Sequence, residues 1–394
     1  MTWLDDFMDD TVEAESPRSY FWWSGLCAIS AVVSNKVYVN KQIYKLYPNL
    51  FVLLIGKSGL RKSGPVSMVK QIVERSELVK VISGRSSIQA IVKQLGQAWT
   101  LESGKVLADP SAFIVSSEFA SSLVKDEAAL TILTDLHDSH YHSEGWRYTL
   151  KNSAPDFLKS PCITFLSATN QTHFDDMISE TSMMGGFIAR TILVVENKKS
   201  RINALLDESE KKFNSDKFIP YLKELSKIEG EMILNNEAKD MYKSWYHSFC
   251  ESDIDDKTGT SERVHDRIMK VAMNISLAEN TSLLITGQHM QMALDACING
   301  VSLANKATMS SGKSELAAKA AIFMNRLFTS PDYTIDRKTL LSREWGNFDH
   351  QDLDRIVQTL EAGGMITSEA VGGVVYYQLT EGSIQYYLSE TKKN

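Results

Sequence analysis

The sequence lacks the features of secreted, membrane-spanning or metal-binding proteins. Its four cysteines lie far apart and form no Cys-x-x-Cys pair, so metal spacing is absent and a disulfide framework is not expected. The longest uninterrupted apolar run, residues 50–55, is far too short to span a bilayer. The first 15 residues are acidic and lack the charged and apolar parts of a signal peptide. We therefore expect a cytoplasmic protein with no membrane partner.

An excess of positive charge is also lacking. The chain has 42 Lys+Arg against 49 Asp+Glu, which gives a formal net charge of -7. Proteins that coat nucleic acid by bulk electrostatics are normally basic. If this chain binds nucleic acid, its positive groups must be concentrated in a pore or groove.

The composition is that of a folded protein with a substantial core. Hydrophobic residues make up 43% and charged residues 23% of the 394 residues. This length is enough for two or three domains of ordinary size.

The first half of the chain alternates strand-like and helical patterns. Buried runs predict strands at residues 36–40, 49–55, 112–116, 162–168 and 189–195. Helical patterns occur at residues 16–34, 65–74, 87–97 and 120–137. Such alternation predicts a doubly wound α/β domain with a parallel sheet. The aromatic run 20–23 is more typical of a core or subunit contact than of a base-stacking platform.

The second half is predicted to be mainly helical. The polar stretch 197–216 marks a boundary, and helical patterns follow at residues 217–225, 236–250, 261–279 and 287–307. After a linker at 309–314, helices at 315–329, 336–343 and 349–362 precede strands at 365–369 and 374–379. The strands are joined by Gly372-Gly373, so three helices and a Gly-Gly hairpin predict a winged helix. The predicted domains are an α/β core at 1–200, a helical lid region at 201–310 and a winged-helix domain at 311–394.

A glycine-containing loop follows the most apolar predicted strand. It resembles the P-loop pattern G-x-x-x-x-G-K-[ST], with Arg61 in place of the second glycine, and opens the helix at 65–74. Lys62 is predicted to reach the β/γ-phosphates and Ser63 to hold Mg²⁺. The alternative is a glycine-rich turn without a ligand. The predicted nucleotide-binding residues of the loop are Gly56, Ser58, Gly59, Arg61, Lys62 and Ser63.

Polar side chains end the next two predicted strands. Glu118 follows the strand at 112–116 and is the candidate catalytic base and metal-organising carboxylate, with Ser117 where an Asp is usual. The alternative is an exposed glutamate at a strand end. Asn170 follows the strand at 162–168 and is a candidate sensor of the attacking water or γ-phosphate. An asparagine that caps a turn is the other interpretation.

Arg190 lies at the start of the last predicted strand. A lone arginine there usually faces solvent. In a ring ATPase, however, an arginine at this place reaches the neighbouring subunit's γ-phosphate and stabilises transition-state charge.

Taken in order, these segments resemble AAA+ helicases of phages, plasmids and mobile elements, the MCM-like kind often fused to primases. The resemblance covers roughly residues 20–300 and lies in the order and spacing of the motifs. The matching segments are LYPNLFVLLIGKSGLRKS, VISGRSSIQAIVKQL, AFIVSSEFASSL, TDLHDS, PCITFLSATN and GGFIARTILVVEN. Such proteins usually carry a primase-polymerase domain ahead of the ATPase, for which this sequence has no room. We therefore expect a stand-alone motor, with priming left to a partner protein.

The resemblance also implies a mechanism. It implies a P-loop AAA+ ATPase domain with a helical lid that uses ATP and Mg²⁺ and acts as a hexameric ring around single-stranded DNA. Arg190 matches the arginine finger, and either Arg263 or Arg267 is the second sensor; the sequence does not choose between them. Residues 145–158 match a hairpin that grips DNA in the pore, with Lys151 near its tip and Arg147 as an aide. An ordinary surface hairpin is the alternative.

Two other features bear on function. His137, His140 and His142 lie near Asp135 and Asp138 but have no partner cluster elsewhere, so a solvated loop is expected rather than a metal site. The predicted helix at 349–362 is acidic, which favours docking over sequence reading. Besides the helicase, the sequence allows a nucleotide-switched DNA- or protein-binding module, such as an initiator, a loader or a defence component, and a nucleotide-free interaction protein.

Overall fold

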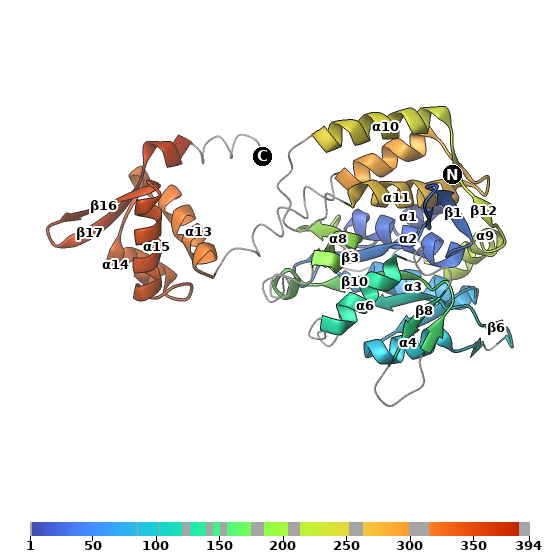
Figure 1. Cartoon of the computed structure of the whole chain (residues 1–394). Helices are drawn as coiled ribbons and strands as arrows, with labels where there is room; N and C mark the ends of the chain where they lie inside the picture. The colour runs from blue at the N-terminus through green and yellow to red at the C-terminus, as the bar shows by residue number, and fades with distance from the viewer. Residues whose placement is uncertain are drawn as a thin grey trace. The chain divides into compact units, whose positions relative to one another are not determined.

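A computed structural model describes residues 2–84, 86–101, 103–119, 127–138, 145–149, 156–174, 185–203, 213–251, 263–298 and 315–385. The chain forms two compact units, Met1–Thr308 and Met309–Asn394 (Figure 1). The predicted linker at 309–314 lies outside the described residues.

Five parallel strands form the central sheet of the larger unit, in the order β11-β3-β10-β7-β4. Every residue of β3 and β10 is buried, as expected for central strands covered on both faces. The predicted α/β class is therefore confirmed, with a helix-flanked parallel sheet consistent with Rossmann-like and P-loop-type cores. The strands are β3 (Phe51–Gly56), β4 (Lys80–Ser83), β7 (Ser111–Ser116), β10 (Cys162–Thr169) and β11 (Thr191–Glu196).

Alternate side chains of β3 enter two different cores. Val52 and Leu54 pack with α2 and α3, whereas Phe51, Leu53 and Ile55 pack with α4, α6 and α8. This alternation is the two-residue period of a strand buried on both faces. The helices are α2 (Arg18–Val33), α3 (Ser63–Ser76), α4 (Ile88–Gly96), α6 (Glu127–His137) and α8 (Gly185–Arg190).

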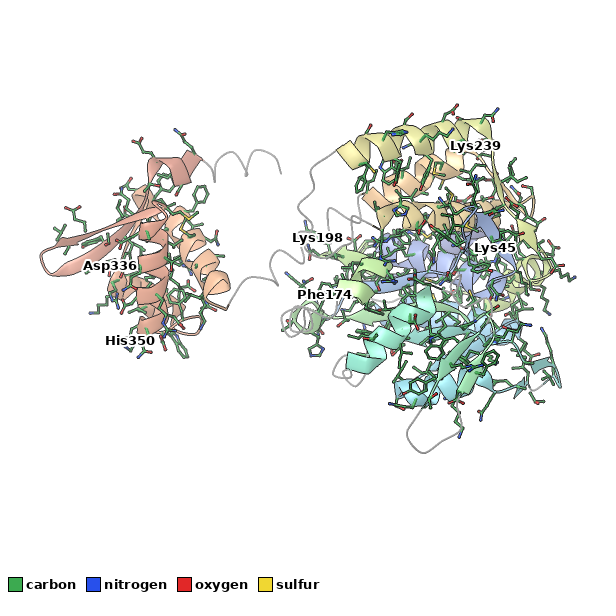
Figure 2. All side chains as sticks on the ribbon, in the orientation of Figure 1. Lys45, Phe174, Lys198, Lys239, Asp336 and His350 are labelled. Atoms are coloured by element: carbon green, nitrogen blue, oxygen red, sulfur yellow. The ribbon has the colours of Figure 1, made fainter. Side chains whose placement is uncertain are left out.

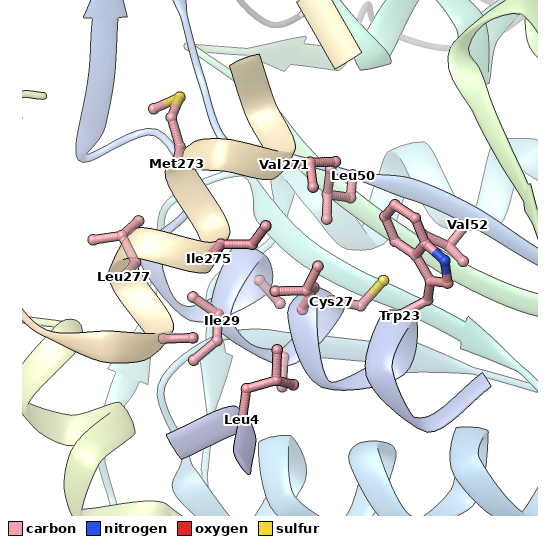
Figure 3. Close-up of a cluster of buried hydrophobic side chains, with 14 of the residues drawn as sticks. Leu4, Trp23, Cys27, Ile29, Leu50, Val52, Val271, Met273, Ile275 and Leu277 are labelled. Carbon is pink, nitrogen blue, oxygen red and sulfur yellow. The ribbon is translucent and has the colours of Figure 1, made fainter. Parts of the chain in front are cut away.

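The first core extends from the sheet through α2 to α11 (Val264–Glu279), as Figure 3 shows for Cys27, Ile29, Val52 and Ile275. Within the predicted aromatic run, Tyr20, Phe21 and Trp23 are buried here. The interpretation of that run as core is confirmed.

A helix that the sequence analysis did not predict, α1 (Trp3–Asp10), covers α2. Thr2 caps it, accepting a hydrogen bond from the Asp5 N–H at 3.0 Å while the Asp5 carboxylate accepts one from the Thr2 N–H. A Cβ on Gly25 of α2 would lie 2.7 Å from Leu4 Cδ1, so the two helices approach closely because this residue is glycine.

The helices after β11 belong to the same unit, and α11 shares the first core with α2. They are η4 (Ser215–Phe218), α9 (Ile219–Leu225), α10 (Asn236–Glu251), α11 and a helix over residues 287–298. The parallel pair of β1 (Val37–Asn40) and β12 (Gly230–Glu231) links these helices to the rest of the unit, and β1 also pairs with β2 (Lys45–Leu46). Strands β13 (Ile233–Leu234) and β14 (Leu284–Ile285) pair within the helical segment. Two further hairpins are β5 (Trp99–Thr100) with β6 (Val106–Leu107), and β8 (Trp146–Tyr148) with β9 (Asp156–Leu158).

The smaller unit packs helices on an antiparallel sheet of order β15-β17-β16 around Phe323, Ile356 and Tyr377. Asp336 caps α14 by accepting a hydrogen bond from the Thr339 N–H at 2.9 Å (Asp336 is labelled in Figure 2). The turn between β16 and β17 has positive φ at both glycines, 59° and 81°, which is the geometry that Gly372-Gly373 predicts. The elements are α13 (Glu315–Phe328), η5 (Pro331–Tyr333), β15 (Thr334–Asp336), α14 (Arg337–Glu344), α15 (His350–Ala362), β16 (Ile366–Val371) and β17 (Val374–Leu379).

Two details differ from the prediction around the central sheet. Ala189 and Arg190 end helix α8 instead of starting β11, and strand β4 was not predicted. Within the described residues, every helix is too short or too polar to cross a bilayer.

Candidate functional site

A cleft of about 410 Å³ opens at the carboxyl ends of β3, β7 and β10. It is lined by three segments that are far apart in sequence: the loop after β3, the residues after β7 and the residues after β10. In open parallel sheets this edge is where ligands bind. The structure thus brings together most of the predicted site: Ser58, Gly59, Arg61, Lys62, Ser63, Glu118 and Asn170, joined by Ser117 and His173.

Gly56 is required by the way the loop leaves β3. A Cβ at this position would lie 2.5 Å from Leu60 Cδ1, 2.6 Å from the Tyr20 hydroxyl and 2.7 Å from the Glu196 carbonyl oxygen. Tyr20 fixes the end of the strand by donating a hydrogen bond to the Ile55 carbonyl at 2.6 Å. No side chain larger than hydrogen fits without movement of the loop.

Two loop residues have left-handed backbone conformations. Gly59 has φ 90° and open space around it, so its glycine serves conformation alone. Arg61, which replaces the second motif glycine, has φ 55°. Arg61 therefore adopts the backbone conformation that glycine favours.

The Lys62 side chain folds back onto the start of the loop. Its ammonium donates hydrogen bonds to the carbonyl oxygens of Gly56 at 2.7 Å and Lys57 at 2.9 Å. Partial burial lowers the pKa of Lys62. Ser63 is exposed and is the first residue of α3. The cleft is therefore lined by the Lys62 ammonium, the Ser63 hydroxyl and the amino terminus of α3.

Glu118 is exposed in the cleft, beside the loop. The Ser116 hydroxyl donates to the Glu118 carbonyl at 2.6 Å, and the Phe119 N–H donates to the Ala168 carbonyl at 2.6 Å. These bonds fix the backbone around Glu118 and tie the end of β7 to that of β10. Ser63 and Glu118 supply the hydroxyl and carboxylate oxygens that Mg²⁺ prefers, and Lys62 and the amino terminus of α3 supply positive charge for phosphate groups, so the residues present fit a magnesium nucleotide.

Asn170 lines the cleft and also caps a helical turn, so the capping interpretation is confirmed and the sensor role stays a prediction. Its Oδ1 accepts a hydrogen bond from the His173 N–H at 2.7 Å, and its Nδ2 lies 3.3 Å from His173 Nδ1. Phe174, labelled in Figure 2, anchors the turn in the second core. His173 was missed by the sequence analysis; the spacing Asn-x-x-His after a buried strand was the available signal.

Arg190 lies at the opposite edge of the sheet from the cleft. In the register of β11 with β3, Thr191 pairs with Phe51 and Glu196 with Gly56. Six residues therefore separate Arg190 from the level of the loop, which is about 20 Å at the rise of a strand. The structure does not bring Arg190 into the cleft of its own chain.

A compact polar cluster holds Arg190 in place. Its Nε donates to both carboxylate oxygens of Asp138, at 3.1 and 3.0 Å, and its Nη1 donates to the Gly186 carbonyl at 3.0 Å. His137 Nδ1 lies 3.0 Å from Asp138 Oδ1, and Lys270 contacts His137 Nε2 at 3.4 Å. Only 11% of the Arg190 side chain is exposed.

Burial sets the charges in this cluster. Burial, assisted by the Lys270 charge, lowers the pKa of His137 to about 3 despite its bond to Asp138. Burial likewise lowers the pKa of Lys270 to about 8. For Asp138, burial opposes ionisation, but hydrogen bonds with His137 and Arg190 outweigh it and hold its pKa below the usual range. The expectation of a solvated loop is therefore wrong for His137, which ends α6 and is buried because it satisfies this cluster; His140 and His142 lie outside the described residues.

The two candidates for the second sensor also lie in this cluster and not in the cleft. Arg267 is buried and donates to the Ala189 carbonyl at 2.6 Å. Arg263 is 46% exposed, and its Nη1 lies 3.7 Å from Asp138 Oδ2. Together with Arg190 they line a small pocket of about 30 Å³. Arg263 is thus the more accessible of the two.

The predicted DNA-gripping hairpin is described only at its base. Strands β8 and β9 pair antiparallel, and Arg147 is exposed with its guanidinium 5.7 Å from the Phe157 ring centre. Lys151 lies outside the described residues. In the described part of the chain, no group of three or more His, Cys, Asp or Glu side chains could hold a metal ion.

No known protein family matches the sequence of this chain, and neither does any curated protein.

Proposed function

We propose that this chain is an ATP-hydrolysing P-loop protein of the AAA+ kind that acts as a ring of subunits to move along or open DNA. One observation carries the proposal: the loop after β3, Glu118 after β7 and Asn170 after β10 line one cleft at the carboxyl edge of a parallel sheet. A phosphate-binding loop, a carboxylate and a polar sensor are the groups that nucleotide hydrolysis requires together.

Each group has a role in this proposal. The loop N–H groups and Lys62 bind the phosphates, and Ser63 and Glu118 hold the bound Mg²⁺, which neutralises charge on the phosphate oxygens. Glu118 also orients a water molecule for attack on the terminal phosphate, and Asn170 keeps that water in place.

Assembly into a ring depends on the resemblance, in which Arg190 matches the arginine finger. To reach a neighbour's nucleotide, its guanidinium would have to leave Asp138 and the Gly186 carbonyl. A guanidinium about 20 Å from its own phosphate loop can act on a nucleotide only if that nucleotide belongs to another copy of the chain. Arg263, at the mouth of the same cluster, is the better placed of the two second-sensor candidates to accompany it across the interface.

The DNA-related part of the proposal depends on the resemblance and on two surface features. Arg147 on β8 supplies an exposed cation at the base of the hairpin at 145–158. Residues 201–310 serve as the helical lid, and the smaller unit is a winged helix whose α15 exposes acidic side chains, which suits docking to a protein rather than reading of DNA.

The second candidate is a nucleotide-switched binding module that assembles on DNA or on a partner protein without unwinding. Ser117 in the place of the usual Asp favours it, because it leaves the metal with one acidic anchor fewer. Nucleotide binding with negligible turnover and no strand separation would select this candidate.

The test compares wild type with Lys62→Ala in Mg·ATP binding, DNA-stimulated ATP hydrolysis and unwinding of a forked duplex. We expect Lys62→Ala to lose binding and both activities, since it removes the cation that meets the phosphates. Lys70→Ala, an ion-paired lysine two turns further along α3, is the matched control and should behave as wild type. A Lys62→Ala protein that unwinds as well as wild type would end the proposal.

A further inference from the structure

The segment before α2 clasps the phosphate loop at Arg61. The buried Ser16 hydroxyl donates to the Arg61 carbonyl at 2.9 Å, and the Gly64 N–H donates to the same oxygen at 3.0 Å. The Arg61 Nε donates to Glu15 Oε2 at 3.2 Å. The Arg61 backbone is thus held in its left-handed conformation by residues outside the loop, while its side chain pairs with Glu15.

Glu15 is shared between the loop and the segment that follows β11. Its Oε2 also accepts a hydrogen bond from Lys199 Nζ at 2.9 Å, and its Oε1 accepts one from the Asn203 N–H at 3.4 Å. The bond from Lys199 outweighs partial burial and lowers the pKa of this carboxyl, so Glu15 is ionised at neutral pH. Its side chain is only 12% exposed.

Arg61 itself remains open to a further acceptor. Its side chain is 69% exposed and lines the cleft, and the bond to Glu15 is made through Nε. A guanidinium binds through up to five N–H donors, and phosphate oxygens are among its preferred acceptors.

We propose that Arg61 is a phosphate-binding residue whose guanidinium exchanges between Glu15 and the anion in the cleft, so that Glu15 sets the affinity for nucleotide. The proposal rests on the proposed function, since it names a further contact in the same site. The exchange does not leave the Glu15 carboxylate without a partner, because Lys199 and the Asn203 N–H still bond it when Arg61 leaves. A polyphosphate competes well with one carboxylate because it carries more charge and more acceptor oxygens.

The variant Arg61→Gly distinguishes a guanidinium that binds phosphate from an arginine that only occupies the position of the motif glycine. Glycine restores the motif and adopts φ 55° without strain, so a backbone argument predicts equal or tighter nucleotide binding. A phosphate-binding guanidinium predicts the opposite, weaker binding. The two interpretations differ in the sign of the effect.

The experiment measures the Kd for Mg·ATP and for a non-hydrolysable ATP analogue by calorimetry on the full chain, with thermal melting to confirm folding. We expect Arg61→Gly to weaken binding about fivefold and Glu15→Gln to tighten it about threefold, magnitudes typical of charge-assisted contacts at a partly exposed site. In the Arg61→Gly/Glu15→Gln double variant the effect of Glu15→Gln should disappear, because exchange needs both partners.

Glu13→Gln is the matched control. Glu13 lies two residues before Glu15 and pairs with Arg201, away from the loop, so this variant removes the same charge without touching Arg61. Its Kd should equal that of wild type. Binding by Arg61→Gly as tight as wild type or tighter would overturn the inference, and so would a Glu15→Gln effect of equal size with and without Arg61.

Failure of the inference differs from failure of the proposed function. If wild type binds Mg·ATP and Lys62→Ala does not, the cleft is a nucleotide site whatever Arg61 does. If wild type binds no nucleotide, the proposed function fails, and the inference fails with it because it needs a bound phosphate.

Discussion

At the scale of single residues, the loop after β3 depends on different properties of Gly56 and Arg61. Gly56 is fixed by contact, since a Cβ would lie within 2.7 Å of three neighbouring atoms. Arg61 adopts a left-handed backbone that costs an L-residue about 1–2 kcal/mol, and Ser16 and Gly64 hold its carbonyl in that conformation. The motif predicted the loop, but the clasp from residues 15–16 joins positions 45 residues apart and has no local signal.

His137 makes a pH-dependent contribution to stability that can be measured. The pKa of His137 is about 3 in the folded chain, against 6.5 for the free side chain. Between these two values His137 is protonated in the unfolded chain and neutral in the folded chain. The free energy of unfolding should therefore fall by about 1.4 kcal/mol per pH unit from this residue alone as the pH drops from 6.5 to 4.

In His137→Gln this contribution is absent, and denaturant melts at each pH should give a correspondingly shallower fall. His247→Gln, at an exposed position of α10, is the control and should keep the wild-type slope. Equal slopes for wild type and His137→Gln would show that His137 is not buried in the neutral form.

At the scale of elements, long apolar or strongly periodic segments were predicted well. The strand–loop–helix unit of β3 and α3, the helices α2 and α15, and the Gly372-Gly373 hairpin were predicted because each has a continuous run, a clear period or a turn signal. Strand β4 was not predicted because one of its two buried positions is Lys80, a charged residue type that is seldom buried. Helix α8 takes Ala189 and Arg190 because Arg190 bonds the Gly186 carbonyl one turn earlier, a contact that strand propensity does not predict.

Arg190 ends helix α8 and bonds Asp138, which directly follows α6. The proposed role of Arg190 leads to a prediction on turnover. Arg190→Ala should leave the Kd for Mg·ATP close to wild type but lower the turnover of the assembled protein by about 10³-fold, as loss of an arginine finger does. Steady-state ATP hydrolysis at saturating nucleotide measures this change.

Stability needs its own control, because Arg190→Ala removes the closest cation of the buried Asp138 and leaves it with His137 and the more distant Arg263. Loss of one partner of a buried ion pair costs up to about 3–5 kcal/mol. The double variant Arg190→Ala/Asp138→Asn removes both members of the ion pair and should recover most of that stability without recovering turnover. An equal loss of turnover in a strictly monomeric preparation would contradict action across an interface.

At the scale of the whole molecule, the central sheet separates two polar sites in the larger unit. The cleft lies at the carboxyl ends of the strands, and the cluster of Arg190, Arg263 and Asp138 lies at the amino ends. The order of motifs along the chain predicted which residues meet in the cleft, because the carboxyl ends of parallel strands share one edge. It did not predict the cluster. Its members Asp138, Arg190 and Lys270 come from three separate segments and meet only through tertiary packing.

The most direct test of the account is a subunit-mixing measurement of ATP hydrolysis. Lys62→Ala lacks the phosphate-binding lysine of the cleft but keeps Arg190. Arg190→Ala keeps an intact cleft but lacks the guanidinium. Each variant alone should be nearly inactive, and mixing them should restore turnover, because an intact cleft then meets an intact Arg190 on a neighbouring subunit. A mixture no more active than the sum of its parts, at concentrations where the subunits assemble, would contradict a nucleotide site completed by the neighbour.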